Sequence, residues 1–349
     1  MKPFFRSSLR VLAVTVVTLA GLLGLTAAAI TQPTFSITRR PDGPRADPER
    51  LRRHVELLTR EVWPRDSDHP ENLDRAAVYL RDQFAASRVR VTTPDFHVHG
   101  RTYRNVVASF GPEAGPILIV GAHYDSFGGF GANPGADDNA SGTAGLLELA
   151  RLLAGHRLEQ RVDLVAFANE EPPYFGSAQM GSAVHARSLA GREVRGMICL
   201  EMIGYFTPRQ PSPNWLFRFL YPNRGDFIAV AGRWADRELT RQVKRAMRGG
   251  SDLPVVSFTA PRSAGLDGSD QINYWDRGIP AVMVTDTADI RNPHYHSPLD
   301  TAETLDYPRM ARVVDGVTNA VLAICGKTAQ HAASMLHSEH GESPGQEPS

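Results

Sequence analysis

Histidine and acidic residues gather beside several short apolar segments of this 349-residue chain. The apolar segment 117–121 is followed at once by His123 and Asp125, and positions i and i+2 of an extended chain share one face. The later candidates are Asp137, Glu170, Glu171, Glu201, His294 and His296. A divalent cation would stabilise such a group, because without one the anions repel each other and lose hydration without compensation. We therefore expect a metal site.

The mixture of ligand types indicates which metal chemistry to expect. Zinc binds both imidazole and carboxylate readily, and two ions sharing one carboxylate would need about five protein ligands. A zinc pair about 3.5–4 Å apart can lower the pKa of a shared water and polarise a carbonyl. A carboxylate outside the ligand set would then move the proton. The adjacent Glu170 and Glu171 would face different ways on an extended strand end, so one could bind metal while the other acts as the base.

The elements expected to position these residues alternate along the chain. Apolar runs of four to seven residues, each typical of a buried strand, alternate with segments whose apolar residues recur at helical spacing. This alternation predicts a three-layer α/β sandwich, in which helices cover both faces of a mostly parallel or mixed sheet. Ligands of such sheets collect at the carboxyl ends of the strands. The candidate residues lie at or just after those ends.

Five segments resemble, in order, the motifs of the M28 family of zinc metallopeptidases, the aminopeptidase group. The segments are G-A-H-Y-D-S (121–126), G-A-D-D-N-A-S-G (135–142), F-A-N-E-E (167–171), L-E-M-I-G (200–204) and Y-H-S-P-L-D-T (295–301). Each motif is modest evidence alone, but five in order at compatible spacing are specific. The resemblance covers about residues 51–326 and implies a phosphorylase/hydrolase-like α/β sandwich.

The resemblance also implies a role for each matched residue. Two zinc ions per chain would be bound, one by His123 and Glu201 and the other by Glu171 and His296, with Asp137 bridging them. The remaining roles fall to Glu170 as the general base, Asp125 as the carboxylate that orients His123, and Tyr295 as a hydroxyl donor to the oxyanion. A cis peptide between Asp137 and Asp138 is implied as well.

One matched position departs from the family pattern. Many family members have Asp where this chain has Glu201. A glutamate can still bind the metal, with one more methylene to accommodate, so Glu201 remains a predicted ligand.

The N-terminal segment predicts export. Lys2, Arg6 and Arg10 precede an uncharged apolar run over residues 11–30, which is typical of a signal peptide or of an uncleaved membrane anchor. Both interpretations remain open, and both place the body outside the cytoplasm, periplasmic or extracellular, because the positive charge stays inside. We expect residues 1–30 to be this segment, 31–50 a linker, 51–328 the peptidase domain and 329–349 a disordered polar tail.

Composition and the cysteines add narrower constraints. The formal net charge is zero, so composition does not suggest nucleic-acid binding. The resemblance to M28 peptidases implies a peptide substrate. Cys199 and Cys325 fall in apolar segments, which favours two buried thiols over a disulfide.

The alternatives are a carboxypeptidase or dipeptidase of the same fold, a single-zinc glutaminyl cyclase, and a non-catalytic binding ectodomain. Metal stoichiometry separates them: about two ions per chain favours the peptidase, one the cyclase and none the ectodomain.

Overall fold

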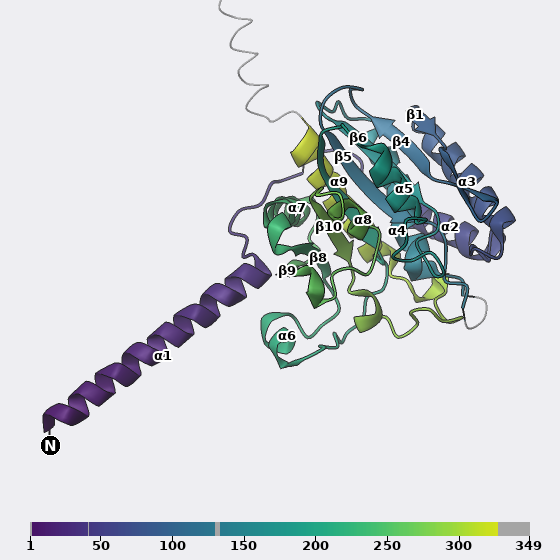
Figure 1. Ribbon diagram of the computed structural model, residues 1–349. Coiled ribbons are helices and arrows are strands. Elements are labelled where there is room, and N and C mark those ends of the chain that lie inside the picture. Colours follow the sequence, from purple (N-terminus) through teal and green to yellow (C-terminus); the bar gives the residue numbers. More distant parts are fainter. Residues whose placement is uncertain (1, 41, 130–132, 327–349) are drawn as a thin grey trace, which may run out of the picture.

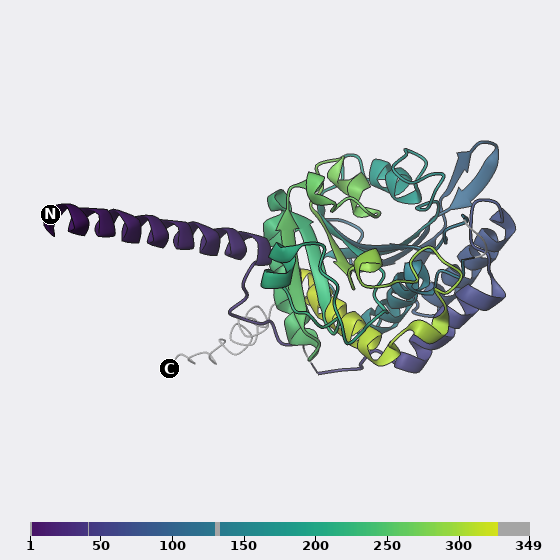
Figure 2. The ribbon, with the colours of Figure 1, turned by 90° about the horizontal axis from the view of Figure 1, so that it is seen from below.

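A computed structural model describes residues 2–40, 42–129 and 133–326 of the chain. The predicted disordered tail, residues 329–349, lies outside the described residues, as does the end of the predicted peptidase domain. Within them, a mixed eight-stranded sheet lies between two layers of helices, with a two-stranded hairpin at its side (Figures 1 and 2). The predicted three-layer α/β class is confirmed.

The large sheet has the order β1-β4-β6-β5-β7-β10-β8-β9. The central strands β6, β5, β7 and β10 are parallel, whereas β1, β4 and β8 pair antiparallel with their neighbours towards the centre. Its strands are β1 (Arg90–Thr92), β4 (Val106–Phe110), β5 (Ile117–His123), β6 (Arg161–Phe167), β7 (Val194–Glu201), β8 (Ile228–Arg233), β9 (Val255–Ala260) and β10 (Ala281–Thr285). The hairpin strands are β2 (Asp95–Val98) and β3 (Arg101–Arg104).

The helices divide between the two faces of the sheet. The larger apolar layer contains α2 (Pro48–Glu56), α3 (Pro70–Ala85), α4 (Gly142–Leu153), α7 (Arg237–Gly250) and α9 (Tyr307–Cys325). The smaller layer contains α5 (Gly181–Ser188) and α8 (Gln271–Trp275). The remaining helices are α1 (Lys2–Thr31) and α6 (Trp215–Leu220). Short π-helical turns, Leu57–Glu61 and Ala136–Ser141, extend α2 and precede α4. Single 3₁₀ turns cover Trp234–Asp236, Arg262–Ala264, Ala288–Ile290 and Ala302–Thr304.

Burial explains the strand patterns. All seven residues of β5 are buried, and the last six of β6 and of β7 are buried too, because helices cover both faces of these strands. The sequences of these strands are therefore nearly continuous apolar runs, without alternation of apolar and polar residues. Both cysteines are buried and free: Cys199 on β7 belongs to the smaller apolar cluster and Cys325 at the end of α9 to the larger one.

The segment predicted as a linker, residues 31–50, contacts the body at Thr38 and Arg40. Arg40 N donates to Gly249 O at 3.0 Å, and Asn319 Nδ2 donates to Thr38 O at 2.5 Å. The Arg40 guanidinium also pairs with the Asp315 carboxylate. The segment therefore runs across α7 and α9 before α2 begins at Pro48.

Candidate metal centre

Two histidines at the carboxyl edge of the sheet face one shared carboxylate. His123 ends β5, and its Nε2 lies 3.3 Å from Oδ1 of Asp138. His296 lies in the loop before α9, and its Nε2 lies 3.1 Å from Oδ2 of the same Asp138. Each oxygen of Asp138 thus faces one imidazole, which is the arrangement required of a carboxylate that binds two ions.

A second carboxylate completes each half of the site. Glu201 ends β7, and its Oε2 lies 3.4 Å from His123 Nε2. Glu171 follows β6, and its Oε2 lies 3.4 Å from His296 Nε2. The possible ligand atoms of each trio, His123–Asp138–Glu201 and Asp138–Glu171–His296, lie within 4.8 Å of one another. The structure thus brings together four of the five residues predicted to bind metal.

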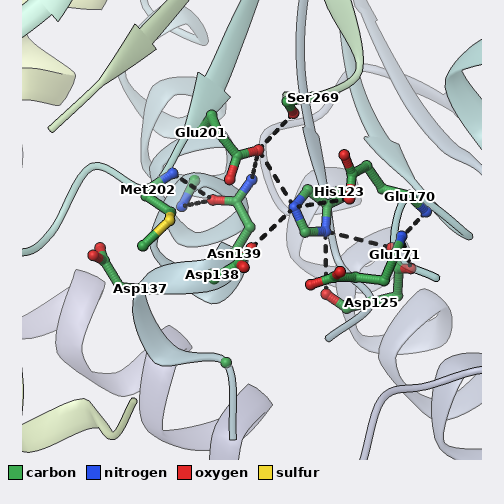
Figure 3. A network of polar contacts seen from close by, with 12 residues as sticks. His123, Asp125, Asp137, Asp138, Asn139, Glu170, Glu171, Glu201, Met202 and Ser269 are labelled. Carbon is green, nitrogen blue, oxygen red and sulfur yellow. Dashed lines mark hydrogen bonds and ion pairs between the residues drawn. The ribbon is translucent and has the colours of Figure 1, made fainter. Parts of the chain in front are cut away.

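The fifth predicted ligand, Asp137, is corrected to Asp138. The Asp137 carboxylate turns away from both histidines: it accepts hydrogen bonds from Gly204 N at 3.0 Å and from Asn292 Nδ2 at 2.8 Å. Figure 3 shows it well apart from His123. The cis peptide is likewise one residue later than expected, between Asp138 and Asn139. Residue spacing does not distinguish two aspartates in succession, so both predicted positions fall one residue early.

Asp300 and Asn139 hold this turn in place. The Asp300 carboxylate accepts hydrogen bonds from the backbone N–H groups of Asp137, at 2.9 Å, and Asp138, at 3.1 Å. Asn139 Oδ1 accepts from Met202 N at 3.2 Å, and its Nδ2 donates to Leu200 O at 2.9 Å. The turn before α4 is therefore tied to the end of β7, the strand that ends in Glu201.

Asp125 connects the two glutamates to His123. Its Oδ1 and Oδ2 accept from the backbone N–H groups of Glu170, at 3.1 Å, and Glu171, at 3.0 Å. The same Oδ1 lies 3.5 Å from His123 Nδ1. A single carboxylate thus sets the position of the segment after β6 and lies behind the imidazole, on the ring side opposite Nε2 (Figure 3).

Glu170 lies beside the trios without belonging to either. Its Oε2 is 3.8 Å from His123 Nε2, and the residue is 4% exposed. Burial raises the pKa of Glu170 well above its usual range; the His123 charge opposes this shift and the neighbouring Glu171 adds to it. A carboxylate with a raised pKa and no place among the ligands is suited to accept and return a proton.

The electrostatics of the site fit a cation. Burial is the main reason that the pKa of Glu171 rises to about 8, and the nearby Asp138 charge contributes. Burial also raises the pKa of Glu201. Moreover, Glu171 Oε1 is buried without a hydrogen-bond partner among the described residues, which is costly for an acceptor unless a ligand occupies it. Buried carboxylates with an orphaned oxygen and two imidazoles form a donor set that suits zinc.

Four further residues near the site were not among the predicted site residues. Ser269 Oγ, before α8, donates to Glu201 Oε2 at 2.5 Å. Phe127 stacks on the His296 ring at 4.0 Å between centroids. Arg65 is fully buried and donates to four backbone carbonyls, including those of Tyr124 at 2.8 Å and Gly135 at 3.1 Å. Asp270 is fully buried, and its charge is among those that raise the pKa of Glu170. Ser269-Asp270 resembles a segment near the family's pocket, but a helix cap is an equally good interpretation of that pair. Phe127 directly follows the first motif but has no metal-binding group, and Arg65 lies far in sequence from every motif.

Tyr295 was predicted to donate a hydrogen bond. Its ring stacks on His296 at 3.8 Å between centroids, and the residue is 38% exposed. Burial, followed by the Asp138 charge, raises the pKa of its hydroxyl. The hydroxyl therefore keeps its proton at neutral pH.

Comparison with known proteins identifies relatives of the chain. The model of "Peptidase family M28" matches residues 105–321. An uncharacterised protein of Escherichia coli, YfbL, is 51% identical over 287 residues, covering 79% of this chain and 88% of that protein. Leucine aminopeptidase 1 of Arthroderma otae is 25% identical over 224 residues, covering 61% of this chain and 55% of that protein. The chain therefore spans about half the length of this curated aminopeptidase.

Solved structures agree on the fold. A zinc aminopeptidase from Bacillus subtilis superposes with a TM-score of 0.64 at 15% identity, covering 82% of this chain and 97% of that one. A glutaminyl cyclase from Fimbriiglobus ruber superposes with a TM-score of 0.59 at 22% identity, covering 82% and 99%. At these identities the likeness concerns the fold, which peptidases and cyclases share.

Proposed function

The chain belongs to peptidase family M28, and on that premise we propose that it is a di-zinc aminopeptidase that removes N-terminal residues from peptides. The single observation that carries the proposal is the position of Asp138, whose two oxygens each face one histidine. A site for one ion would not require two trios built around a shared carboxylate.

The ligands divide between two zinc ions. His123 and Glu201 would hold one ion, Glu171 and His296 the other, and Asp138 both. When bound, a zinc pair lowers the pKa of a water and polarises the scissile carbonyl. Asp125 fixes the relative position of the two halves of the metal site. Its carboxylate accepts hydrogen bonds from the backbone N–H groups of Glu170 and Glu171 and also lies behind His123.

The proton transfers fall to Glu170. As general base it would take a proton from the attacking water, and as general acid it would return that proton to the amine that leaves. Burial favours the protonated form of Glu170, and nearby positive charge favours the ionised form. The fraction of Glu170 that is ionised therefore depends on the positive charge around it. Tyr295, which keeps its hydroxyl proton, would donate a hydrogen bond to the developing oxyanion.

Export is part of the proposal. An apolar helix near the N-terminus, residues Leu12–Thr31, is long enough to cross a membrane, and a signal sequence would have the same properties. With positively charged residues before it, the body would be periplasmic or extracellular.

The test combines metal content with hydrolysis. We would measure cleavage of a panel of aminoacyl arylamides by the full chain with zinc, after chelation, and in the variant Glu170→Gln. We expect chelation to abolish cleavage and Glu170→Gln to lower kcat/KM at least about 100-fold while zinc content remains two per chain. The control is Glu193→Gln, a substitution at an exposed glutamate, which should change neither quantity.

Other outcomes would select the alternatives. One zinc per chain with turnover of N-terminal glutaminyl peptides would identify a cyclase. Two zincs with cleavage only of substrates that have a free C-terminus would identify a carboxypeptidase or dipeptidase. A chain that binds no metal and cleaves nothing would be a binding ectodomain on the same fold.

A further inference from the structure

The C-terminal end of α1 is joined to the body by side chains of β9 and α7. A helix leaves its last four carbonyls without intrahelical donors. Here Thr259 Oγ1 lies 2.5 Å from the carbonyl oxygen of Ala29, and Ser257 Oγ and Lys244 Nζ each lie 2.7 Å from that of Thr31. The buried Lys244 ammonium also complements the negative end of the helix dipole. Side chains of β9 and α7 thus cap the C-terminal end of α1.

This joint lies where the apolar span of α1 ends. The span Leu12–Thr31 has 20 residues, and at about 1.5 Å of rise per residue it matches the roughly 30 Å hydrocarbon core of a bilayer. None of its most apolar stretch is buried against the body. If α1 crosses a membrane, the bilayer surface must therefore pass close to the joint at β9.

Helix α6 attaches to the same residues of β9. The Tyr221 hydroxyl that follows α6 donates to Ser257 O at 2.9 Å, and the Phe217 ring packs on Phe258 at 5.0 Å between centroids. Residues 257–259 thus hold the end of α1 and α6 together. Figure 1 shows both on the same side of the body.

The outward face of α6 carries large apolar side chains. Trp215 is 77% exposed and Phe219 is 82% exposed, and their spacing of four residues places them on one face of the helix. Trp234 adds a third aromatic at the joint: it is 51% exposed, and its Nε1 donates to Thr259 O at 3.0 Å. Aromatic residues of this kind collect at the interface of a membrane with water.

Arginines border the same region. Arg241 donates to the Gln32 side chain at 3.0 Å and Arg248 to Thr34 O at 2.8 Å, so both lie beside the segment that leaves α1, and both are exposed. Arg218 is exposed on α6 itself. Guanidinium groups beside interfacial aromatics fit the phosphates of lipid headgroups.

We propose that α1 is retained as a membrane anchor and that α6 makes a second contact with the same phospholipid bilayer, through Trp215 and Phe219, with Trp234 beside the anchor. Two contacts joined through β9 hold the body in one orientation on the membrane. The segment after α1 restricts rotation of the body relative to the anchor, because residues 38–40 are hydrogen-bonded to α7 and α9. The inference concerns placement of the body and holds whether or not the metal centre is a peptidase.

The first measurement is the intact mass of the full chain purified from the membrane fraction. A chain that retains residues 1–30 supports the anchor. A chain cleaved in or just after residues 27–29 overturns it.

The second measurement is fluorescence quenching of the full chain in vesicles of phosphatidylcholine and phosphatidylglycerol, with and without bromine near the headgroup end of the acyl chains. The Trp215 signal is the difference between Trp234→Phe and the double variant Trp234→Phe/Trp215→Phe. We expect brominated lipid to reduce this signal at least about twofold.

The control is a tryptophan introduced by Val78→Trp in the double variant. Val78 is 48% exposed on α3, at the end of the body away from α1 (Figure 1). Its signal should not change with bromination. A Trp215 signal as insensitive as this control would overturn the contact of α6 with the bilayer.

Discussion

Asp137 and Asp138 form a matched pair for testing how the metal centre is built. Both carboxylates are buried and adjacent in the chain, yet they face different partners. Asp138 faces His123 and His296, whereas Asp137 accepts hydrogen bonds from Gly204 N and Asn292 Nδ2. Substitution of each by asparagine changes the same atoms and the same charge, so any difference between the variants reports position alone.

Asp138→Asn should remove zinc from both halves of the site. The amide retains one acceptor oxygen, so it cannot serve two ions, and the loss of one negative charge leaves the dications undercompensated in a buried place. Loss of a residue that merely orients a ligand costs about 10–100-fold in metal affinity. For the shared ligand we therefore expect more than about 100-fold per ion, or at least about 2.7 kcal/mol.

Asp137→Asn should leave both ions in place. Burial raises the pKa of Asp137 to about 6, so loss of its negative charge costs less there than it would in water. The amide can still accept from Gly204 N, but its NH₂ group would oppose that of Asn292. The expected cost is about 1–3 kcal/mol of unfolding free energy, with little change in zinc affinity.

The assay is zinc content at controlled free zinc, with arylamide hydrolysis and urea unfolding measured in parallel. Two retained zincs in Asp138→Asn, or loss of both in Asp137→Asn with Asp138→Asn intact, would refute the assignment of the shared ligand. If both variants lost stability but kept the zinc content of the unsubstituted chain, neither carboxylate would bind metal.

Two other predictions concern single side chains. Ser269→Ala should weaken the zinc held by His123 and Glu201 about 10-fold, because the hydroxyl that holds Glu201 at 2.5 Å is lost, and should spare the other zinc; equal weakening of both in a chelator titration would contradict it. Burial lowers the pKa of His185 to about 4 in the folded chain. As the pH falls below about 6.5, the unfolded chain therefore binds a proton at this residue before the folded chain does. The free energy of unfolding should fall between about pH 6.5 and pH 4, by up to about 3 kcal/mol. His185→Gln should therefore reduce the loss of stability between pH 7.5 and 4.5, and urea midpoints that fall as steeply as in the unsubstituted chain would argue against this role.

Long apolar runs made most of the fold predictable. The apolar segment 117–121 lies in β5, and Glu201 ends β7, as expected of a candidate residue at a strand end. Buried strands and amphipathic helices carry their patterns locally, so a sequence shows them. Helix α5 carries no such local pattern: it is short, lies in a Gly- and Ser-rich region and packs on α8, so its stability comes from tertiary contacts. The strand order depends on long-range pairing and has no local signal.

What the sequence by itself determined about the metal centre is its residue types and their location at strand ends, because metal chemistry restricts the ligands and α/β topology restricts where they meet. What only the tertiary structure decided is which of two adjacent aspartates points inward, since Asp300 orients both of their backbone N–H groups from more than 160 residues away. The support of Glu201 by Ser269 and the joint between α1 and β9 arose in the same way. Each depends on a contact between segments far apart in the chain, and residue spacing carries no record of such contacts.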